Sequence, residues 1–428
     1  VPVIMGGHHV TAAPESALNS GYVDYVVLGE GEFTFQNLLN ILKNQKFKNL
    51  NSLSGIAFRN DDHIQINPVK EFIANLDELP APRNEKYFYS KMILTSRGCP
   101  RDCNFCSIKK VMAKRIRFRS IEAVIREITG AINSGITNID FEDDTLTFNR
   151  QHAIKLFSAL IEHFGKKDIT FSAQNGIDAN TLDEELINLM KAAGFRWLNL
   201  PLVSGSQHIQ NQLNRNQSRA RFQKVIEIAS RYDLKITAYL IIGLPEDNPM
   251  RLLDDINYLA TQRLLLGPSI FYPPPGTETY ENCVQLGYIA REDYIKFRST
   301  ALAVSTRDFS RIDLITLFRL CRVINYLKNL IDKNEISSFQ PHIDSAILFS
   351  DDMITTHKLN SGEIGQILLH QLFRNRKLRG LRYKGKKDLR HQYEWIDYPQ
   401  SSQIIGKFIQ SIKGEKICGV ETSHFTCV

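Results

Sequence analysis

The sequence contains no run of 18 or more apolar residues, so no part of it is predicted to span a membrane. A strong excess of one charge is also missing. The net charge is +7 at pH 7 in 428 residues, which does not by itself indicate a nucleic-acid partner. Seven scattered cysteines argue against a disulfide framework and predict a reducing, cytoplasmic setting. The chain starts at Val1 without an initiator methionine, and we expect the natural protein to begin earlier.

The length and the alternation of elements predict an α/β fold. The chain is long enough for two or three domains of about 150 residues each. From residue 91 onward, β-rich segments alternate with amphipathic helices, and six such repeats predict a parallel sheet with right-handed crossovers. The predicted strands are Met92–Thr95, Asn138–Phe141, Ile169–Ala173, Trp197–Pro201, Lys235–Ile242 and Ser269–Tyr272.

Several helices carry recognisable start and stop signals. Ser120 precedes a run of isoleucines and valines at helical spacing and is predicted to be an N-cap. Thr181 and Glu184 stand at capping-box spacing before a helix that is predicted to end at Gly194. Leu314–Ile331 has the pattern of an amphipathic helix.

Three cysteines fall within eight residues in the pattern C-x3-C-x2-C: Cys99, Cys103 and Cys106. The spacing places three thiolates around one point on a tight loop, and the next cysteine is the distant Cys283. An iron–sulfur cube usually takes four cysteines, so three would leave one iron open for chemistry. A structural zinc site would need a fourth Cys or His at short spacing, and it remains the alternative interpretation.

Phe105 extends the motif to C-x3-C-x-aromatic-C, which resembles the cluster loop of radical S-adenosylmethionine (SAM) enzymes. The resemblance implies a partial (β/α)6 barrel of TIM type whose cluster loop follows the first strand. It implies that Cys99, Cys103 and Cys106 are the catalytic ligands of a 4Fe–4S cluster. It further implies cleavage of SAM to a 5′-deoxyadenosyl radical, a small-molecule substrate, and an electron donor such as flavodoxin or ferredoxin.

Barrels of this kind carry their chemistry at the carboxyl ends of the strands, which directs attention to polar residues there. Asp143 and Asp144 match the family pattern F-x-D-D, and one of them is expected to accept hydrogen bonds from the SAM ammonium group. Gln174 and Asn175 could bond ribose hydroxyls, although an ordinary turn explains them equally well.

The residues at the ends of the later strands match the family motifs only in part. Val203 stands where relatives commonly have a glutamate near the cofactor, which weakens that contact or shifts its role to Ser204. Arg215 could pair with the methionyl carboxylate of SAM, with a plain surface arginine as the alternative. Gly243 belongs to a G-L-P-x-E turn that, by resemblance, lies against the adenine. Phe105, beside the third cysteine, completes the candidate SAM contacts.

Residues 1–75 resemble the second half of the Rossmann-like cobalamin-binding domain that precedes many radical SAM domains. The resemblance rests on two glycine turns after strands, and such turns let a backbone approach a cofactor closely. The candidate cobalamin contacts are Gly6, Gly7, Gly29, Glu30 and Gly31. The half of that domain with the cobalt-ligating histidine motif is not in this sequence. We therefore expect weak or no cobalamin binding by residues 1–428, and recovery on N-terminal extension.

The predicted organisation is a partial cobalamin domain (1–75), a proline-bearing linker (76–90), the barrel (91–295) and an α-rich C-terminal region (296–428). The basic segment 374–390 is predicted to be a solvated face, and an anion-binding site is the alternative. The predicted function is cobalamin-linked methylation of an unactivated carbon. A radical cyclase or rearrangement enzyme is one alternative, and a non-catalytic iron–sulfur or zinc protein is the other.

Overall fold

The computed structural model describes residues 1–83, 89–165, 167–294, 297–298, 302–334, 379–387, 390–397, 401–411 and 419–420. The chain divides into two compact units. The first unit comprises Val1–Arg196, Asn211–Asn216 and Tyr272–Phe297. The second comprises Trp197–Gln210, Gln217–Phe271 and Arg298–Val428.

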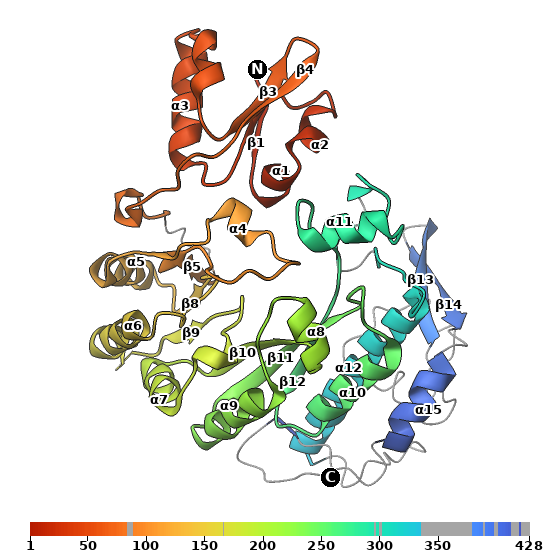
Figure 1. The fold of residues 1–428 in the computed structure, drawn as a ribbon. Coiled ribbons are helices and arrows are strands. Elements are labelled where there is room, and N and C mark those ends of the chain that lie inside the picture. Colours follow the sequence, from red (N-terminus) through yellow and green to blue (C-terminus); the bar gives the residue numbers. More distant parts are fainter. Residues whose placement is uncertain are drawn as a thin grey trace. The chain divides into compact units, whose positions relative to one another are not determined.

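The first unit begins with a four-stranded sheet in the order β1-β2-β3-β4 (Figure 1). Its elements are β1 (Ile4–Gly6), α1 (His8–Ala12), α2 (Pro14–Leu18), β2 (Tyr25–Val27), α3 (Glu32–Lys43), the 3-10 helix η1 (Phe47–Ser52), β3 (Ile56–Asn60) and β4 (His63–Asn67). β1 and β2 are parallel, whereas β3 and β4 form an antiparallel hairpin that the sequence analysis did not anticipate.

Alternation along β2 builds a separate core on each face of this sheet, because successive strand residues point to opposite faces. Val26 packs with Val10 and Leu18 from the helices that follow β1. Val27 packs with Leu38 of α3 and with Ile56 of β3. The two glycine turns, at the ends of β1 and β2, therefore belong to a packed α/β layer.

The rest of the first unit contains three parallel strands in the order β5-β8-β9. Its elements are η2 (Leu76–Glu78), β5 (Lys91–Ile93), β6 (Ser96–Arg97), α4 (Ile108–Val111), β7 (Arg117–Phe118), α5 (Ile121–Asn133), β8 (Asn138–Phe141), α6 (Arg150–Phe164), β9 (Thr170–Ser172), η3 (Ala179–Thr181), α7 (Glu184–Ala193) and α11 (Glu278–Gln285). β8 has the predicted bounds, and helices α5 to α7 alternate with the strands as predicted.

Two of the three helix caps predicted in this unit are observed, and one is wrong. The Ser120 hydroxyl accepts a hydrogen bond from the Ala123 amide and caps α5, as predicted. Gly194 ends α7 in the left-handed conformation, at φ 114°, which confirms its predicted role. The predicted capping box at Thr181 is wrong: Asp183 caps α7 through the Leu186 amide, because Thr181 is used in η3.

The second unit contains the parallel strands β10 (Trp197–Val203), β11 (Lys235–Ile242) and β12 (Leu265–Ile270), in that order. The expected strand Ser269–Tyr272 is displaced toward the N-terminus, because β12 runs through Gly267 and Pro268 and ends at Ile270. Proline is compatible with an edge strand, and β12 is at the edge of this sheet. The helices are α8 (Gln207–Gln212), α9 (Arg219–Arg231), α10 (Pro249–Ala260), α12 (Arg311–Asp332) and α15 (Ser401–Ser411).

The C-terminal region contributes α12 and α15, together with a hairpin of β13 (Arg379–Lys387) and β14 (Arg390–Asp397) that was not predicted. The predicted helix Leu314–Ile331 is confirmed within α12, which begins with a capping box of Ser310 and Asp313. The side chains of the basic segment 374–390 lie outside the described residues. Within the described part of the chain, no helix is long and apolar enough to cross a membrane.

Lys328 of α12 is fully buried and donates hydrogen bonds to the carbonyl oxygens of Ala260, at 2.8 Å, and Gln262, at 2.6 Å. It thereby binds backbone acceptors at the end of α10. Burial lowers the pKa of Lys328 from 10.5 to about 7, against the opposing charge of Asp332.

We expect the stability of the protein to rise with pH above 7 because of Lys328. The unfolded lysine keeps its proton up to its ordinary pKa of 10.5, whereas the folded one releases it near 7. Unfolding then takes up a proton, so the free energy of unfolding increases by roughly 1 kcal/mol per pH unit between 7 and 9. Urea denaturation at pH 7, 8 and 9 measures this slope. Lys328→Met should flatten it, and equal slopes in both proteins would contradict the assignment.

Candidate functional site

The three cysteines lie on one loop, residues 98–116, that leaves β6 and returns at β7. The antiparallel pair β6–β7 closes its neck, with Arg97 opposite Arg117. Gly98 starts the loop at φ 96°, and a Cβ atom there would lie within 3.0 Å of the carbonyl oxygens of Met112, Ala113 and Arg115. Only glycine therefore permits this close return of the chain. The predicted position of the loop after the first strand of the sheet is observed.

The thiols of this loop are free and largely shielded from solvent. Cys99 and Cys103 are buried and Cys106 is half-buried. Burial, together with the charges of Cys103 and Cys99, raises the pKa of Cys106 to about 11. Burial likewise raises the pKa of Cys99. Each of the two thiols therefore holds a proton at neutral pH, which it must release to ligate a cation.

Among the described residues, no three His, Cys, Asp or Glu side chains converge as around a single metal ion. Tetrahedral zinc brings all its ligands to one atom, whereas each cysteine of an iron–sulfur cube binds a different iron. The three shielded thiols of this loop can each bind a different iron of such a cube.

Asn104, between the second and third cysteines, anchors the loop and was missed by the sequence analysis. Its amide nitrogen donates to the Gln212 carbonyl oxygen at 2.7 Å, and its backbone N–H donates to the Leu213 carbonyl oxygen at 3.3 Å. Thr279 donates to it through both hydroxyl and backbone N–H, at 3.2 and 3.3 Å. Arg101 adds an ion pair with Asp178, beyond the end of β9. Such long-range partners leave no local signal in the sequence.

The carboxylates after β8 have different surroundings. Asp143 is buried and accepts hydrogen bonds from the backbone and hydroxyl of Thr95, at 3.0 and 2.7 Å, and from the Ser96 hydroxyl. Burial raises its pKa, and these hydrogen bonds oppose the rise. Asp144 is half-buried. Its burial and the charge of Asp143 raise its pKa to about 6, while a hydrogen bond from the Gly98 backbone lowers it.

The electrostatic influence of Asp144 reaches Cys99 and Cys106, since its charge raises the pKa of both thiols. Asp144 therefore lies close to the cysteine loop, whereas Asp143 ties the end of β8 to the chain that leads into that loop. This difference favours Asp144 as the carboxylate available to a ligand.

The other predicted SAM contacts of the first unit have less definite surroundings. Gln174 and Asn175 are exposed after β9. The Asn175 amide donates to the Glu142 carbonyl oxygen at 2.8 Å, and the Gln174 backbone N–H donates to Asp140 at 3.1 Å. Phe105 and Arg215 are both half-buried.

In the second unit, the end of β10 is a tightly held turn. Val203 has φ 68°, a left-handed conformation that is unfavourable for a β-branched residue. Ser204 is buried, and its hydroxyl donates to Asp255 at 3.1 Å, as does the Gly205 backbone N–H at 2.8 Å. The Ser204 hydroxyl thus helps to hold the turn.

The position of Gly243, after β11, also requires glycine. It has φ 92°, and a Cβ atom there would come within 2.9 Å of the Leu314 side chain. Glycine therefore allows α12 to pack directly against this turn.

All five predicted cobalamin contacts line one cavity of about 430 Å³ in the first unit: Gly6, Gly7, Gly29, Glu30 and Gly31. Arg97 and Met112 of the cysteine-loop region also line it, as do Ile4, Met5, Val27, Glu32 and Phe35. Gly7 has φ 106° with nothing within 4 Å of a Cβ position, so its backbone is open to an approaching group. The Glu30 carboxylate, however, is bound to Arg97 and Arg117. We call this space the glycine cavity.

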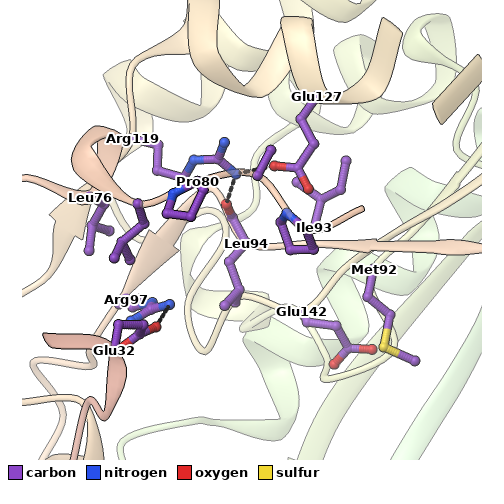
Figure 2. Close-up of a pocket in the computed structure, with 13 residues that line it drawn as sticks. Glu32, Leu76, Pro80, Met92, Ile93, Leu94, Arg97, Arg119, Glu127 and Glu142 are labelled. Carbon is purple, nitrogen blue, oxygen red and sulfur yellow. Dashed lines mark hydrogen bonds and ion pairs between the residues drawn. The ribbon is translucent and has the colours of Figure 1, made fainter. Parts of the chain in front are cut away.

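A second cavity of about 460 Å³, the linker cavity, shares Glu32 and Arg97 with the first. The linker provides apolar walls from Leu76 to Pro82, and β5 adds Met92 and Ile93. Figure 2 shows Arg97 paired with Glu32 and Arg119 bound to the Leu94 carbonyl oxygen. The cavity therefore combines apolar walls with charges that are mostly already paired.

A parallel-stranded α/β unit with a three-cysteine loop after its first strand and an acidic pair after the next has the features of a radical SAM domain. Residues 93–259 match the family model of the Radical SAM superfamily, so the chain contains a radical SAM domain.

Two curated relatives extend the likeness beyond that domain. The chain is 28% identical over 338 residues to an uncharacterized methyltransferase, PH0819, of Pyrococcus horikoshii, covering 76% of this chain and 72% of that protein. It is 25% identical over 337 residues to the cytidylyl-2-hydroxyethylphosphonate methyltransferase of Streptomyces wedmorensis, covering 68% of this chain and 62% of that enzyme.

Solved structures share the fold at low identity. The cobalamin-dependent SAM radical enzyme OxsB matches 95% of this chain and 62% of its own, with a TM-score of 0.62 and 15% identity. The radical SAM methyltransferase TsrM of Kitasatospora setae matches 66% of this chain and 58% of its own, with a TM-score of 0.58 and 16% identity. The chain thus spans about three fifths of the length of these structures.

Proposed function

We propose that this protein is a radical SAM enzyme that carries out cobalamin-linked methylation of an unactivated carbon in a small molecule. The observation that carries the proposal is the loop of three shielded, free cysteines beside Asp144, within the radical SAM domain. The methyltransferase names of the relatives support the methyl-transfer part. OxsB and TsrM have been solved with cobalamin bound, which supports its use here.

Cys99, Cys103 and Cys106 would hold a 4Fe–4S cluster as thiolates, leaving one iron without a protein ligand. A cluster bound there would supply the electron that cleaves SAM to methionine and a 5′-deoxyadenosyl radical. Asp144 would accept hydrogen bonds from the SAM ammonium group, and burial of the loop would exclude water from it. The roles of Phe105, Gln174, Asn175, Ser204, Arg215 and Gly243 at SAM stay predictions.

The glycine cavity suits the face of a flat macrocycle, because the backbone at Gly7 is open to a close approach. We expect Gly6→Phe to lower the affinity for hydroxocobalamin at least tenfold by filling this space. A Cβ at Gly6 meets only ordinary contacts, at 3.6 Å or more, so the fold should survive. Spectroscopic titration of the wild type and of the Gly6→Phe variant with hydroxocobalamin measures this. Equal binding by Gly6→Phe would place cobalamin elsewhere.

The linker cavity is our candidate for the substrate. It adjoins the glycine cavity through Arg97 and Glu32 and reaches Glu142 at the end of β8. A volume of about 460 Å³ lies in the range of small-molecule sites. A flavodoxin or ferredoxin as electron donor, and a cytoplasmic location, remain predictions from the family resemblance and the cysteine content.

Product analysis tests the proposal. The anaerobically reconstituted protein is incubated with reductant, SAM and hydroxocobalamin. Release of 5′-deoxyadenosine is expected, together with S-adenosylhomocysteine if methyl transfer occurs. A cyclase without methyl transfer, the activity named for the anaerobic magnesium-protoporphyrin IX monomethyl ester cyclase of Cereibacter sphaeroides, which is 23% identical, would give the first product alone. If neither 5′-deoxyadenosine nor S-adenosylhomocysteine forms, the proposed function is refuted.

A further inference from the structure

We propose that Glu30 is a positioning residue: its carboxylate, supplied by the glycine turn after β2, clamps the neck of the cysteine loop through two arginines. The inference rests on the proposed function only in that the loop is taken to bind a 4Fe–4S cluster. It assigns the Glu30 carboxylate a role different from the cobalamin contact expected from the family resemblance.

The neck of the loop is formed by a minimal pair of strands. β6 and β7 contain two residues each and pair only at Ser96 with Phe118 and at Arg97 with Arg117. So short an antiparallel ribbon is not stable by itself. The 19 residues from 98 to 116 that carry the cysteines therefore need further contacts at this point.

Glu30 supplies those contacts to both strands at once. One carboxylate oxygen lies 3.3 Å from Arg97 Nη1, and the other lies 2.6 Å from Arg117 Nη1. The second oxygen also accepts the Ile73 backbone N–H at 2.8 Å. The two arginines occupy facing positions on β6 and β7, so one carboxylate joins the two sides of the neck.

Arg117 extends the clamp into the loop itself. Its Nη2 donates to the Met112 carbonyl oxygen at 2.6 Å, inside the loop, and its Nη1 donates to the Ile73 carbonyl oxygen at 2.7 Å. Glu30 therefore orients a guanidinium group that binds the segment before the linker, at Ile73, and the returning arm of the loop, at Met112. The planar guanidinium group thus donates from Nη1 to Glu30 and Ile73 and from Nη2 to Met112, which fixes its direction.

Burial makes the clamp strong. The side chain of Glu30 is 2% exposed, and those of Arg117 and Arg97 are 9% and 15% exposed. Removing the carboxylate would leave two shielded cations without their shared partner, which costs more than the loss of a surface ion pair. Glu32 is a weaker contributor, because its side chain is 38% exposed and it pairs with Arg97 alone.

The chain offers a matched control in Glu127. Its side chain is 3% exposed and also joins two cations, Arg119 at 2.6 Å and Lys91 at 3.4 Å. Glu127 belongs to α5, and its partners Arg119 and Lys91 lie outside the cysteine loop. Glu30→Gln and Glu127→Gln thus remove similar buried carboxylates. Only Glu30 binds side chains of β6 and β7 themselves, whereas Arg119, the partner of Glu127, binds Leu94 and Thr95, before β6.

The test measures alkylation of individual cysteines in the metal-free, full-length chain by a maleimide, with peptide mass spectrometry. We expect Glu30→Gln to accelerate labelling of Cys99, Cys103 and Cys106 about tenfold, because local opening becomes easier. Cys283 and Cys321, both buried, are the internal references and should react at the wild-type rate. Glu127→Gln should leave the three loop cysteines at the wild-type rate.

Two outcomes would overturn the proposal: loop labelling within twofold of wild type in Glu30→Gln, or equal acceleration in Glu127→Gln. If Glu30→Gln unfolds, so that Cys283 and Cys321 also react, Arg117→Lys decides. This variant keeps the positive charge but loses the planar guanidinium group, so we expect a smaller acceleration of labelling that is limited to the loop cysteines. If Arg117→Lys shows no acceleration, the clamp is refuted. The assay needs neither cluster nor SAM, so a failure of the proposed function leaves its result intact.

Discussion

Replacing any one of Cys99, Cys103 or Cys106 by alanine is expected to reduce SAM cleavage to background. Each thiolate of a cluster binds a different iron, so the other two cannot take over its position. The loop supplies no substitute, since the next described cysteines are Cys283 on α11 and Cys321 on α12. The measurement is the yield of 5′-deoxyadenosine after anaerobic reconstitution, with iron and acid-labile sulfide determined on the same samples.

Cys283→Ala is the matched control, because it removes a buried thiol outside the loop. It should keep wild-type iron and sulfide content and wild-type cleavage. The triple alanine variant distinguishes the classes of protein considered for the sequence. Formation of 5′-deoxyadenosine by that variant would refute the radical SAM assignment, whereas zinc without sulfide in the wild type would indicate a structural metal site.

The parts of the site that depend on local spacing could be predicted from the sequence. The cysteine loop follows β5 because the motif follows an apolar strand, and β8 and β11 have the predicted bounds. The glycine turns meet in one cavity because β1 and β2 are parallel neighbours, which brings their carboxyl ends together.

The rest depends on partners far apart along the chain. The Glu30 carboxylate binds Arg117, 87 positions away, and Asn104 binds Thr279, 175 positions away. No periodicity or spacing encodes such pairs, because the fold alone brings them together. The error in the predicted cap at Thr181 had a different origin. Two side chains two positions apart could each cap the helix, and Asp183 does so because Thr181 belongs to η3.

The roles of the two carboxylates after β8 could not be predicted from the sequence either, because these adjacent residues of one motif have different partners in the fold. Three hydrogen bonds from Thr95 and Ser96 occupy Asp143, which holds the end of β8 against the start of the cysteine loop. Asp144 has one hydrogen bond, from Gly98, and a pKa of about 6. We therefore propose that Asp143 supports the fold and that Asp144 is the carboxylate available to SAM.

Substitution of each carboxylate should separate these roles. Asp143→Ala leaves buried donors of Thr95 and Ser96 unsatisfied, and we expect the free energy of unfolding to fall by roughly 3 kcal/mol or more. Asp144→Asn should leave stability nearly unchanged and weaken SAM binding by about one to two orders of magnitude, the equivalent of roughly 1.5–3 kcal/mol. Urea denaturation and equilibrium dialysis with SAM measure the two quantities.

The pH dependence gives an independent check on Asp144. Its raised pKa of about 6 means that it becomes protonated below that pH, where it can no longer accept charge-assisted bonds from an ammonium group. SAM affinity of the wild type should therefore fall as the pH drops from 7 to 5, and Asp144→Asn should lack this dependence. If Asp143→Asn, rather than Asp144→Asn, abolished SAM binding in a protein of unchanged stability, the two roles would have to be exchanged.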